Sequence, residues 1–359
     1  MKDLGSLDVV FAGDLNDYSK GYSRLKAMYG LGVPVRAATQ TPIEGGEGGF
    51  ARASLAFRVA WKLGFHLDTE GINSWLIDQA RQKAPDVIWI EKGNMVRPST
   101  LRRLKNICPG AVLVSYTDDD MFNPVNRSVW YRRGLKEYDL IFTTKSYNAN
   151  PDELPAMGAK KVIMVDKAYD PDHHHPIELM VEESDQLSCD VGFIGSFEAP
   201  RAADMDYLAG EGIPVRVWGN GWSGYRPGSG NLAIENRALV NSGGNPLYSK
   251  GICASRINLA FLRKANRDLQ TDRSIEIPAC GGFMLAEWSE EHERLFEEDR
   301  EAVFFRAREE LVEKCRYYLS HEDERSAIAR AGYERCIRDG YGQPARMKFM
   351  LEILLTEIS

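Results

Sequence analysis

The stretch DLQTDRSIEIPACGGFMLAE, residues 268–287, joins charged side chains, a helix start and an apolar strand in one short run. Thr271 or Asp272 is a suitable cap for a helix that runs into a Gly-Gly turn. The first N–H groups of such a helix attract an anion, and the guanidinium of Arg273 has a geometry that suits phosphate oxygens. The pattern predicts a helix start that grips a phosphorylated ligand.

Two acidic residues bracket this helix start. Glu276 lies one turn into the helix, and its two acceptor oxygens suit the paired hydroxyls of a ribose. Asp268 precedes it in an acid-x7-acid spacing, so a loop carboxylate and a helix carboxylate can hold two parts of one ligand. The alternative is a capped helix that packs on a sheet and carries surface charges.

Bulk properties favour a two-domain protein. A chain of 359 residues is long enough for two cores. The net charge of −7 and the dispersed basic residues argue against a nucleic-acid partner. The six cysteines show no zinc-type spacing, which favours isolated reduced thiols. The absence of a long apolar run predicts no transmembrane segment, and a cytoplasmic location is expected.

Short apolar runs alternate with amphipathic helical patterns along the chain. This β–α order predicts α/β domains with parallel sheets and right-handed crossovers. The expected strands are 8–12, 86–90, 111–116, 139–143, 161–165, 190–195, 214–219, 258–262 and 283–287, and helical patterns cover 51–64, 73–84, 128–138 and most of the chain after residue 307. Residues 171–188 lack a clear period and are expected to link a domain of residues 1–170 to one of residues 189–340.

Loops that follow the expected strands of the second domain carry the binding candidates, because ligands lie beyond the carboxyl ends of parallel strands. Gly195 permits close approach of the backbone, and Arg201 can meet a phosphate. Gly219 begins a loop that can border the nucleotide. Arg263 and Lys264 form a basic cluster beside the acidic pair, and such cations can stabilise a diphosphate leaving group without magnesium. The alternatives are a turn with a surface arginine and a solvated, ion-paired loop.

Two loops of the first domain carry candidates for a general base or for binding of an acceptor. Asp118 and Asp119 follow the strand 111–116, and Glu91 and Lys92 follow the strand 86–90. The three adjacent aspartates of this loop also resemble a metal-binding cluster. Adjacent side chains rarely converge on one ion, however, and turn or capping roles are common.

Three other features receive weaker interpretations. Gly13 and Asp14 form a third loop after a strand. The glycine-rich residues 45–49 lack the ending of a P-loop and are expected to form a mobile loop near the acceptor. The consecutive histidines 173–175 lie in a Pro- and Asp-rich stretch and are expected to remain exposed without binding a metal.

The run from Arg256 to Phe305 resembles the C-terminal half of CgeB-like glycosyltransferases, which are relatives of the group-1 nucleotide-sugar transferases. The segments 189–222 and 315–336 resemble other parts of the same domain. The segments SYTDDDMFNP, YDLIFTTKSYN and AYDPDHHHP resemble the family's N-terminal domain more loosely. The likeness is good over about residues 180–340 and thin over the first 70.

This resemblance implies a GT-B fold, in which two Rossmann-like domains face each other across a cleft. The C-terminal domain of such proteins binds the nucleotide-sugar and the N-terminal domain binds the acceptor, usually without a catalytic metal. The ribose-binding role falls on Glu276 and the sugar-contacting role on Asp268, where related enzymes commonly carry glutamate. The last helix, within residues 341–359, is expected to brace the N-terminal domain.

The expected function is transfer of a sugar from a nucleotide-sugar to a hydroxyl acceptor in polysaccharide or glycoconjugate synthesis, without cofactor or metal. The acid-x7-acid pattern favours retention of the anomeric configuration. A homodimer is left open. The alternatives are a GT-B nucleotide-sugar epimerase, which would turn over without an acceptor, and a non-catalytic protein that binds sugar nucleotides.

Overall fold

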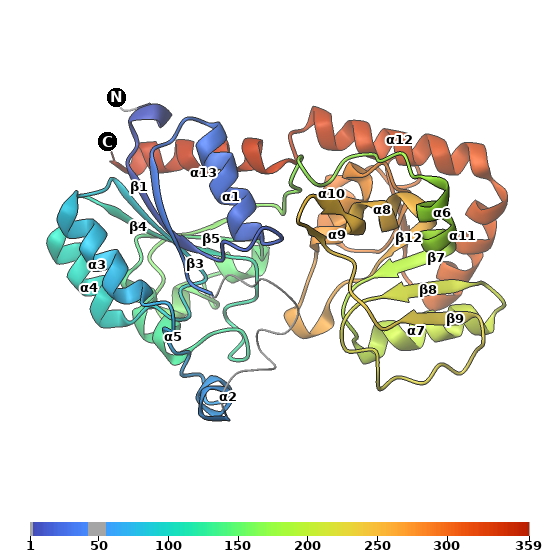
Figure 1. Ribbon diagram of the computed structural model, residues 1–359, viewed down its shortest axis with the longest axis horizontal. Coiled ribbons are helices and arrows are strands. Elements are labelled where there is room, and N and C mark those ends of the chain that lie inside the picture. The colour runs from blue at the N-terminus through green and yellow to red at the C-terminus, as the bar shows by residue number, and fades with distance from the viewer. Residues whose placement is uncertain (1–2, 42–54, 359) are drawn as a thin grey trace. The chain divides into compact units, whose positions relative to one another are not determined.

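The computed structural model describes residues 3–41 and 55–358, without the side chains of residues 55–57. It divides into two compact units (Figure 1). The first unit contains residues 1–166 and 343–359, and the second contains residues 167–342. The second unit is therefore an insertion in the chain of the first.

A six-stranded parallel sheet forms the centre of the first unit, with the strand order β2-β1-β3-β4-β5-β6. Its inner strands are continuous apolar runs because both faces of the sheet are covered. The strands are β1 (Val9–Gly13), β2 (Val35–Thr39), β3 (Val87–Glu91), β4 (Val112–Thr117), β5 (Leu140–Thr143) and β6 (Val162–Met164).

Helices cover both faces of this sheet, and local signals set several of their starts. The hydroxyl of Ser19 accepts the N–H of Tyr22 and caps α1, and Pro98 opens α4. The helices are α1 (Lys20–Gly30), α2 (Leu55–Lys62), α3 (Ile72–Gln82), α4 (Pro98–Ile107), α5 (Val129–Gly134) and α13 (Gln343–Ile358), with 3₁₀ turns η1 (Leu4–Ser6), η3 (Leu135–Glu137), η4 (Ser146–Ala149) and η5 (Pro155–Met157). The last helix, α13, packs against α1.

The second unit has its own six-stranded parallel sheet, with the strand order β14-β13-β12-β7-β8-β9. This is the order of a doubly wound Rossmann sheet. The strands are β7 (Cys189–Ile194), β8 (Val215–Trp218), β9 (Leu232–Glu235), β12 (Ser255–Ala260), β13 (Met284–Glu287) and β14 (Val303–Phe305), and a small antiparallel ladder joins β10 (Asn241–Ser242) to β11 (Asn245–Pro246).

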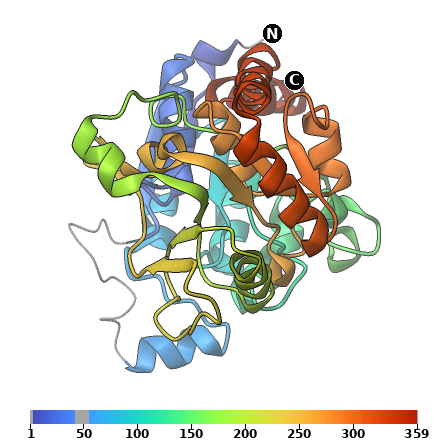
Figure 2. The same cartoon turned by 90° about the vertical axis from the view of Figure 1, so that its right-hand side faces the viewer.

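Figure 2 turns the second unit toward the viewer and shows helices on both sides of its sheet. The helices are α6 (Val181–Leu187), α7 (Ala199–Gly210), α8 (Leu247–Ala254), α9 (Asp272–Ala279), α10 (Glu290–Leu295), α11 (Arg308–Ser320) and α12 (Glu322–Arg338), with a 3₁₀ turn η6 (Lys264–Asn266).

Alternation along the strands divides each core into two layers. In β7, Val191 and Phe193 pack with α7 and α11, whereas Ile194 packs on the opposite face with α8 and α9. In β1, Val10 and Ala12 likewise contribute to a different cluster from their neighbours. Successive side chains of a strand point to opposite faces, so each sheet is covered on both sides.

The residues expected to link two domains have structure of their own. Residues 171–188 lie within the second unit and contain α6. The chain passes from the first unit to the second at residue 166 and returns at residue 343, close to the expected start of the last helix. Within the described residues, no helix is long and apolar enough to cross a membrane. All six cysteines are free thiols.

Candidate functional site

The carboxyl ends of β7 and β12 lie where the strand order of the second sheet reverses. β8 is the neighbour of β7 on one side and β12 is its neighbour on the other. In open parallel sheets such a switch point forms the crevice in which ligands bind. Gly195 follows β7 directly and Arg263 follows β12. Two of the predicted binding loops therefore begin at this point.

Two arginines converge on the ring of Phe193 near the end of β7. The guanidinium carbon of Arg201, in the first turn of α7, lies 5.5 Å from the ring centroid, and that of Arg273, in the first turn of α9, lies 5.3 Å from it. Gly195 leaves room for this approach, because a Cβ there would lie 3.0 Å from Arg273 Nη1. Two helix starts thus bring two cations to the end of one strand.

Each of the two guanidinium groups has an N–H donor for which the described residues provide no hydrogen-bond acceptor. The Nε atoms of Arg201 and Arg273 are buried and have no hydrogen-bond partner among the described residues. Burial lowers the pKa of Arg201, and the like charge of Arg273 lowers it further, against the opposing effect of Glu198. A buried N–H without a partner costs about 1–3 kcal/mol. An anion at this position would remove that cost and the repulsion together.

The cations that follow β12 are more exposed and are ion-paired. Arg263 Nε lies 2.9 Å from Oε1 of Glu198, the same carboxylate that binds Arg201 at 2.8 Å. Lys264 pairs with Glu287, whose other oxygen accepts the N–H of Leu262 at 3.1 Å. Exposed pairs of this kind contribute little to stability, so Arg263 and Lys264 can exchange these partners for a ligand at small cost.

Gly219 allows the loop after β8 to approach the loop after β7. Its φ is +154°, and a Cβ at this position would collide with the carbonyl oxygen of Gly195. That oxygen also accepts the indole N–H of Trp222 at 2.9 Å, and the N–H of Gly195 donates to Trp218 at 2.8 Å. Only glycine fits this approach.

The start of α9 is built as the sequence suggests, with Thr271 as its N-cap. The Thr271 N–H donates to Ser274 Oγ at 2.9 Å, and Ser274 Oγ lies 2.6 Å from His292 Nε2. His292 Nδ1 lies 2.8 Å from the Glu287 carbonyl oxygen and must donate to it, so Nε2 accepts the serine hydroxyl. Burial lowers the pKa of His292 to about 4, and the ring is neutral at pH 7.

Glu276 lies one turn into α9 and is 5% exposed. Its Oε2 accepts the hydroxyl of Tyr248 at 2.7 Å. Its Oε1 lies 3.5 Å from Nε2 of His174. The carboxylate is therefore held between two side chains that come from different segments of the same unit.

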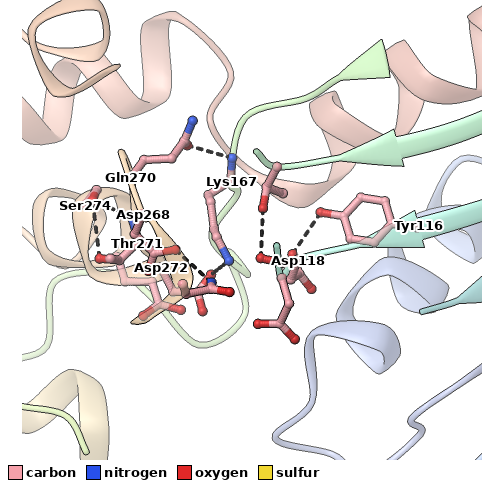
Figure 3. A network of polar contacts seen from close by, with 12 residues as sticks. Tyr116, Asp118, Lys167, Asp268, Gln270, Thr271, Asp272 and Ser274 are labelled. Atoms are coloured by element: carbon pink, nitrogen blue, oxygen red, sulfur yellow. Dashed lines mark hydrogen bonds and ion pairs between the residues drawn. The ribbon is translucent and has the colours of Figure 1, made fainter. Parts of the chain in front are cut away.

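Figure 3 shows the polar groups that precede and open α9. Asp268 accepts the side-chain amide of Asn266 at 2.8 Å. Lys167 is nearly buried, and its Nζ lies 3.2 Å from Asp272 Oδ1. The Lys167 N–H donates to the side chain of Gln270 at 2.9 Å. This network orders the loop between η6 and α9, which carries Asp268, the first member of the acid-x7-acid pair.

In the first unit, the candidate loops follow β1, β3 and β4. Glu91 is buried, and its carboxylate accepts two hydrogen bonds from Arg24, at 2.8 and 2.5 Å, and one from Trp89 at 2.8 Å. Burial alone would lower the pKa of Arg24, but the attraction of Glu91 and Asp118 outweighs burial and raises it well above its ordinary value. Asp118 also accepts the hydroxyl of Tyr116 at 3.2 Å (Figure 3). Glu91 is thus held in place by its hydrogen bonds to Arg24 and Trp89, whereas Asp118 is more exposed to solvent.

The three adjacent aspartates point to different partners. Asp119 pairs with Lys92 at 2.6 Å, and Lys92 has the left-handed φ of +56°. Asp120 is fully buried and accepts the side-chain amide of Asn148 at 2.9 Å. Among the described residues, no group of three or more His, Cys, Asp and Glu side chains is arranged to hold a metal ion. Asp118, Asp119 and Asp120 therefore contact different side chains.

A family model described as "Glycosyl transferase-like" matches residues 201–352. This match begins at Arg201 and includes the whole of α9. A comparison with curated proteins found no match.

Solved structures match nearly the entire chain. A crystal structure of Anabaena Alr3699/HepE in complex with UDP is 11% identical, with a TM-score of 0.59, over 98% of this chain and 100% of that chain. Sucrose-phosphate synthase from Thermosynechococcus elongatus is 11% identical, with a TM-score of 0.61 and the same coverage. A putative UDP-N-acetylglucosamine 2-epimerase from Listeria monocytogenes is 10% identical, with a TM-score of 0.54, over 96% of this chain and 95% of that chain.

The fold is GT-B. The two Rossmann-like units with parallel sheets confirm the predicted fold class.

Some sequence expectations on the GT-B scaffold need correction or remain outside the description. The histidines 173–175 were expected to be exposed, but His174 is buried beside Glu276. The glycine-rich residues 45–49 lie outside the described residues. Asp14, after β1, accepts the N–H and the side-chain amide of Asn16 at 3.1 and 2.7 Å, which is the contact of a turn.

Several residues of the site were not identified from the sequence. Tyr248 and His174 contact Glu276, Lys167 contacts Asp272, and Glu198 joins two arginines. Apart from the contact of Glu198 with Arg201, three positions away, these contacts link segments far apart in the sequence, so no local pattern signals them. The likeness of the segment AYDPDHHHP to the family was the one available sign for His174.

Proposed function

We propose that this chain is a glycosyltransferase that moves a sugar from a nucleotide-sugar to a hydroxyl acceptor without a catalytic metal. The observation that carries the proposal is the pair Arg201 and Arg273, whose buried Nε atoms lack partners among the described residues at the switch point of the second sheet. The family match over residues 201–352 and the GT-B fold support the same conclusion.

In our proposal, the diphosphate of the nucleotide-sugar binds to Arg201 and Arg273. Arg263, Lys264 and the N–H groups at the start of α9 add positive potential nearby. During transfer, the acceptor oxygen forms a bond to the anomeric carbon as the bond between that carbon and the diphosphate oxygen breaks, and negative charge develops on the diphosphate oxygen. Cations that stabilise this charge more in the transition state than in the ground state accelerate the reaction. This is how a transferase can proceed without magnesium.

The ribose of the donor binds Glu276, and the sugar contacts Asp268. A carboxylate is an acceptor only and suits a vicinal pair of hydroxyl donors. Asp268 is one methylene shorter than the glutamate of related enzymes, so its reach toward a sugar is reduced. We propose a CgeB-like member of the group-1 relatives and favour a retaining reaction on the acid-x7-acid spacing.

The acceptor hydroxyl loses its proton to a group of the first unit. Asp118 and Asp119 are partly exposed and suit this role better than Glu91, which is held by Arg24 and Trp89. Lys92, 2.6 Å from Asp119, orients that carboxylate in this proposal.

A binding screen tests the donor site. The folded protein is titrated with UDP-, GDP-, TDP-, ADP- and CMP-linked sugars in EDTA, by thermal shift and calorimetry, with Glu276→Ala and the exposed Glu290→Ala as a matched pair. We expect selective binding that Glu276→Ala abolishes and Glu290→Ala preserves. Failure of the wild-type protein to bind any of these compounds would contradict the proposal.

An epimerase is the second candidate, because the putative UDP-N-acetylglucosamine 2-epimerase described above shares the fold over nearly the whole chain. Incubation of the selected donor with and without a panel of sugar acceptors separates the two activities. Release of nucleoside diphosphate that requires an acceptor supports transfer. Conversion of the donor sugar to its epimer without an acceptor identifies an epimerase, and binding without turnover identifies a non-catalytic protein.

A further inference from the structure

Two side chains fix the carboxylate of Glu276 from opposite oxygens. The Tyr248 hydroxyl donates to Oε2 at 2.7 Å, and His174 Nε2 lies 3.5 Å from Oε1. The rings of Tyr248 and His174 meet edge to face, with their centroids 5.8 Å apart. All three side chains belong to the second unit, so their arrangement does not depend on the first.

The protonation of His174 follows from its other nitrogen. Nδ1 accepts the backbone N–H of Asp170 at 3.1 Å, so this atom carries no proton. The proton of the neutral ring therefore resides on Nε2, which faces Oε1 of Glu276. His174 presents a donor to the carboxylate without adding a charge.

Tyr248 also presents a donor. Burial raises the pKa of its hydroxyl well above the ordinary value, and the negative charge of Glu276 raises it further. The hydroxyl thus keeps its proton at any physiological pH. Tyr248 therefore donates to Glu276, and the proton-bearing Nε2 of His174 faces the other oxygen of the same carboxylate.

The backbone around both side chains is anchored. Ser249, next to Tyr248 in α8, donates its hydroxyl to the carbonyl oxygen of His173 at 2.6 Å. Asn241 accepts the Ser249 N–H at 3.1 Å and donates to its hydroxyl at 2.9 Å. A hydrogen bond therefore joins the start of α8 to the loop that carries His174. The residues it links are the sequence neighbours of the two residues that contact Glu276.

We propose that Tyr248 and His174 are positioning residues that orient Glu276 toward the two hydroxyls of the donor ribose, so that the site selects ribonucleotides over 2′-deoxyribonucleotides. The inference rests on the proposed function. A carboxylate offers about four acceptor positions, and contacts on both of its oxygens fix the direction in which it presents them to a pair of hydroxyls. A ligand without the 2′-hydroxyl loses one charge-assisted hydrogen bond, which corresponds to about a 10-fold to 100-fold loss of affinity.

Calorimetry with UDP, GDP and ADP and with their 2′-deoxy forms measures this selectivity as a ratio of affinities. Tyr248→Phe removes the hydroxyl alone. His174→Asn keeps an acceptor for the Asp170 N–H and lacks the donor near Glu276, whereas His174→Gln keeps a donor at the Nε2 position. The control is Tyr317→Phe, which removes a similar 2.8 Å bond from an exposed tyrosine to Glu324 in the same unit.

We expect the wild-type protein to prefer the ribonucleotide by about 10-fold or more. Tyr248→Phe and His174→Asn should reduce the preference to about 3-fold or less, while His174→Gln and Tyr317→Phe retain it. A structural role alone would weaken binding of both forms equally and leave the ratio unchanged. Circular dichroism confirms folding of each variant, and if Tyr248→Phe fails to fold, the two His174 variants decide the question.

The outcomes separate the two proposals. If the wild-type protein binds no nucleoside diphosphate, the proposed function is refuted, and the inference with it. If it binds without preference for the ribonucleotide, or if the preference survives both Tyr248→Phe and His174→Asn, donor binding stands and the positioning inference is overturned.

Discussion

Replacement of Arg201 by methionine should weaken diphosphate binding while leaving the fold nearly as stable. Methionine keeps an apolar stem against Phe193 and removes the guanidinium. Arg201 is 5% exposed and binds Glu198, and loss of one partner from a buried ion pair ordinarily costs about 3–5 kcal/mol. Glu198 keeps its contact with Arg263 at 2.9 Å, however, and the repulsion between Arg201 and Arg273 disappears. The net change in unfolding free energy should therefore stay within about 1 kcal/mol.

The effect on ligand binding is larger. One hydrogen bond between a charged donor and a phosphate contributes about 1.5–3 kcal/mol, which corresponds to a roughly 10-fold to 150-fold weaker affinity for the nucleoside diphosphate of the donor selected in the binding screen. The matching nucleoside lacks the phosphates and should bind wild type and Arg201→Met alike. Calorimetry measures both ligands, urea unfolding measures stability, and Arg226→Met is the control at an exposed arginine. The reasoning is refuted if binding of the nucleoside diphosphate is unchanged, if the nucleoside loses as much affinity, or if the variant loses about 3 kcal/mol of stability.

Three further predictions concern the scaffold. Gly219→Ala should destabilise the second unit by at least about 2 kcal/mol in urea unfolding, because its Cβ would meet a carbonyl oxygen, whereas Gly224→Ala, in open space, should change stability by less than about 1 kcal/mol. Glu91→Gln should cost about 3 kcal/mol because it removes the closest counter-charge of the buried Arg24 guanidinium and leaves only the more exposed Asp118 at 3.2 Å, and Lys92→Ala, at a side chain 47% exposed, should cost less than about 1 kcal/mol; equal losses would contradict the burial argument. The pKa of His292 is about 4, compared with an ordinary value of 6.5. Its contribution to the free energy of unfolding is therefore complete above pH 6.5 and is lost as the pH falls toward 4. The unfolding free energies of wild type and His292→Asn should therefore converge by about 3 kcal/mol between pH 7 and pH 4, and a constant difference would show that His292 does not titrate in this way.

Most strands that sequence analysis identified are inner strands buried on both faces, and the edge strand Val162–Met164, which is only partly buried, was also identified because it is a continuous apolar run. Val87–Glu91 and Val112–Thr117 are buried at every position, and such strands read as continuous apolar runs. The strand Val35–Thr39 was missed because it lies at the sheet edge and is only partly buried. Leu232–Glu235 is likewise an edge strand, and Val303–Phe305 is too short to give a pattern.

The residues of the site also form two groups. Some could be predicted from their neighbours in the sequence, and others come from distant segments. The helix start at Thr271 and the placement of Arg273 follow from neighbouring residues, because capping and helix dipoles act within one turn. Tyr248 is 28 positions from Glu276 in the sequence, and His174 approaches it from another segment altogether. Contacts of this kind arise from the strand order, which hydrophobic periodicity does not encode.

The return of the chain to the first unit has a consequence for the order of folding during synthesis. Met347, Met350, Leu351 and Leu354 of α13 are fully buried in the core of the first unit beside β1, β3 and β4. The ribosome makes residues 167–342 before these four, which at about 5–20 residues per second takes on the order of ten to thirty seconds. Throughout that interval the second unit can complete its own core, while the nascent first unit keeps exposed the part of one apolar sheet face that α13 later covers beside α1, and this part is available to a chaperone.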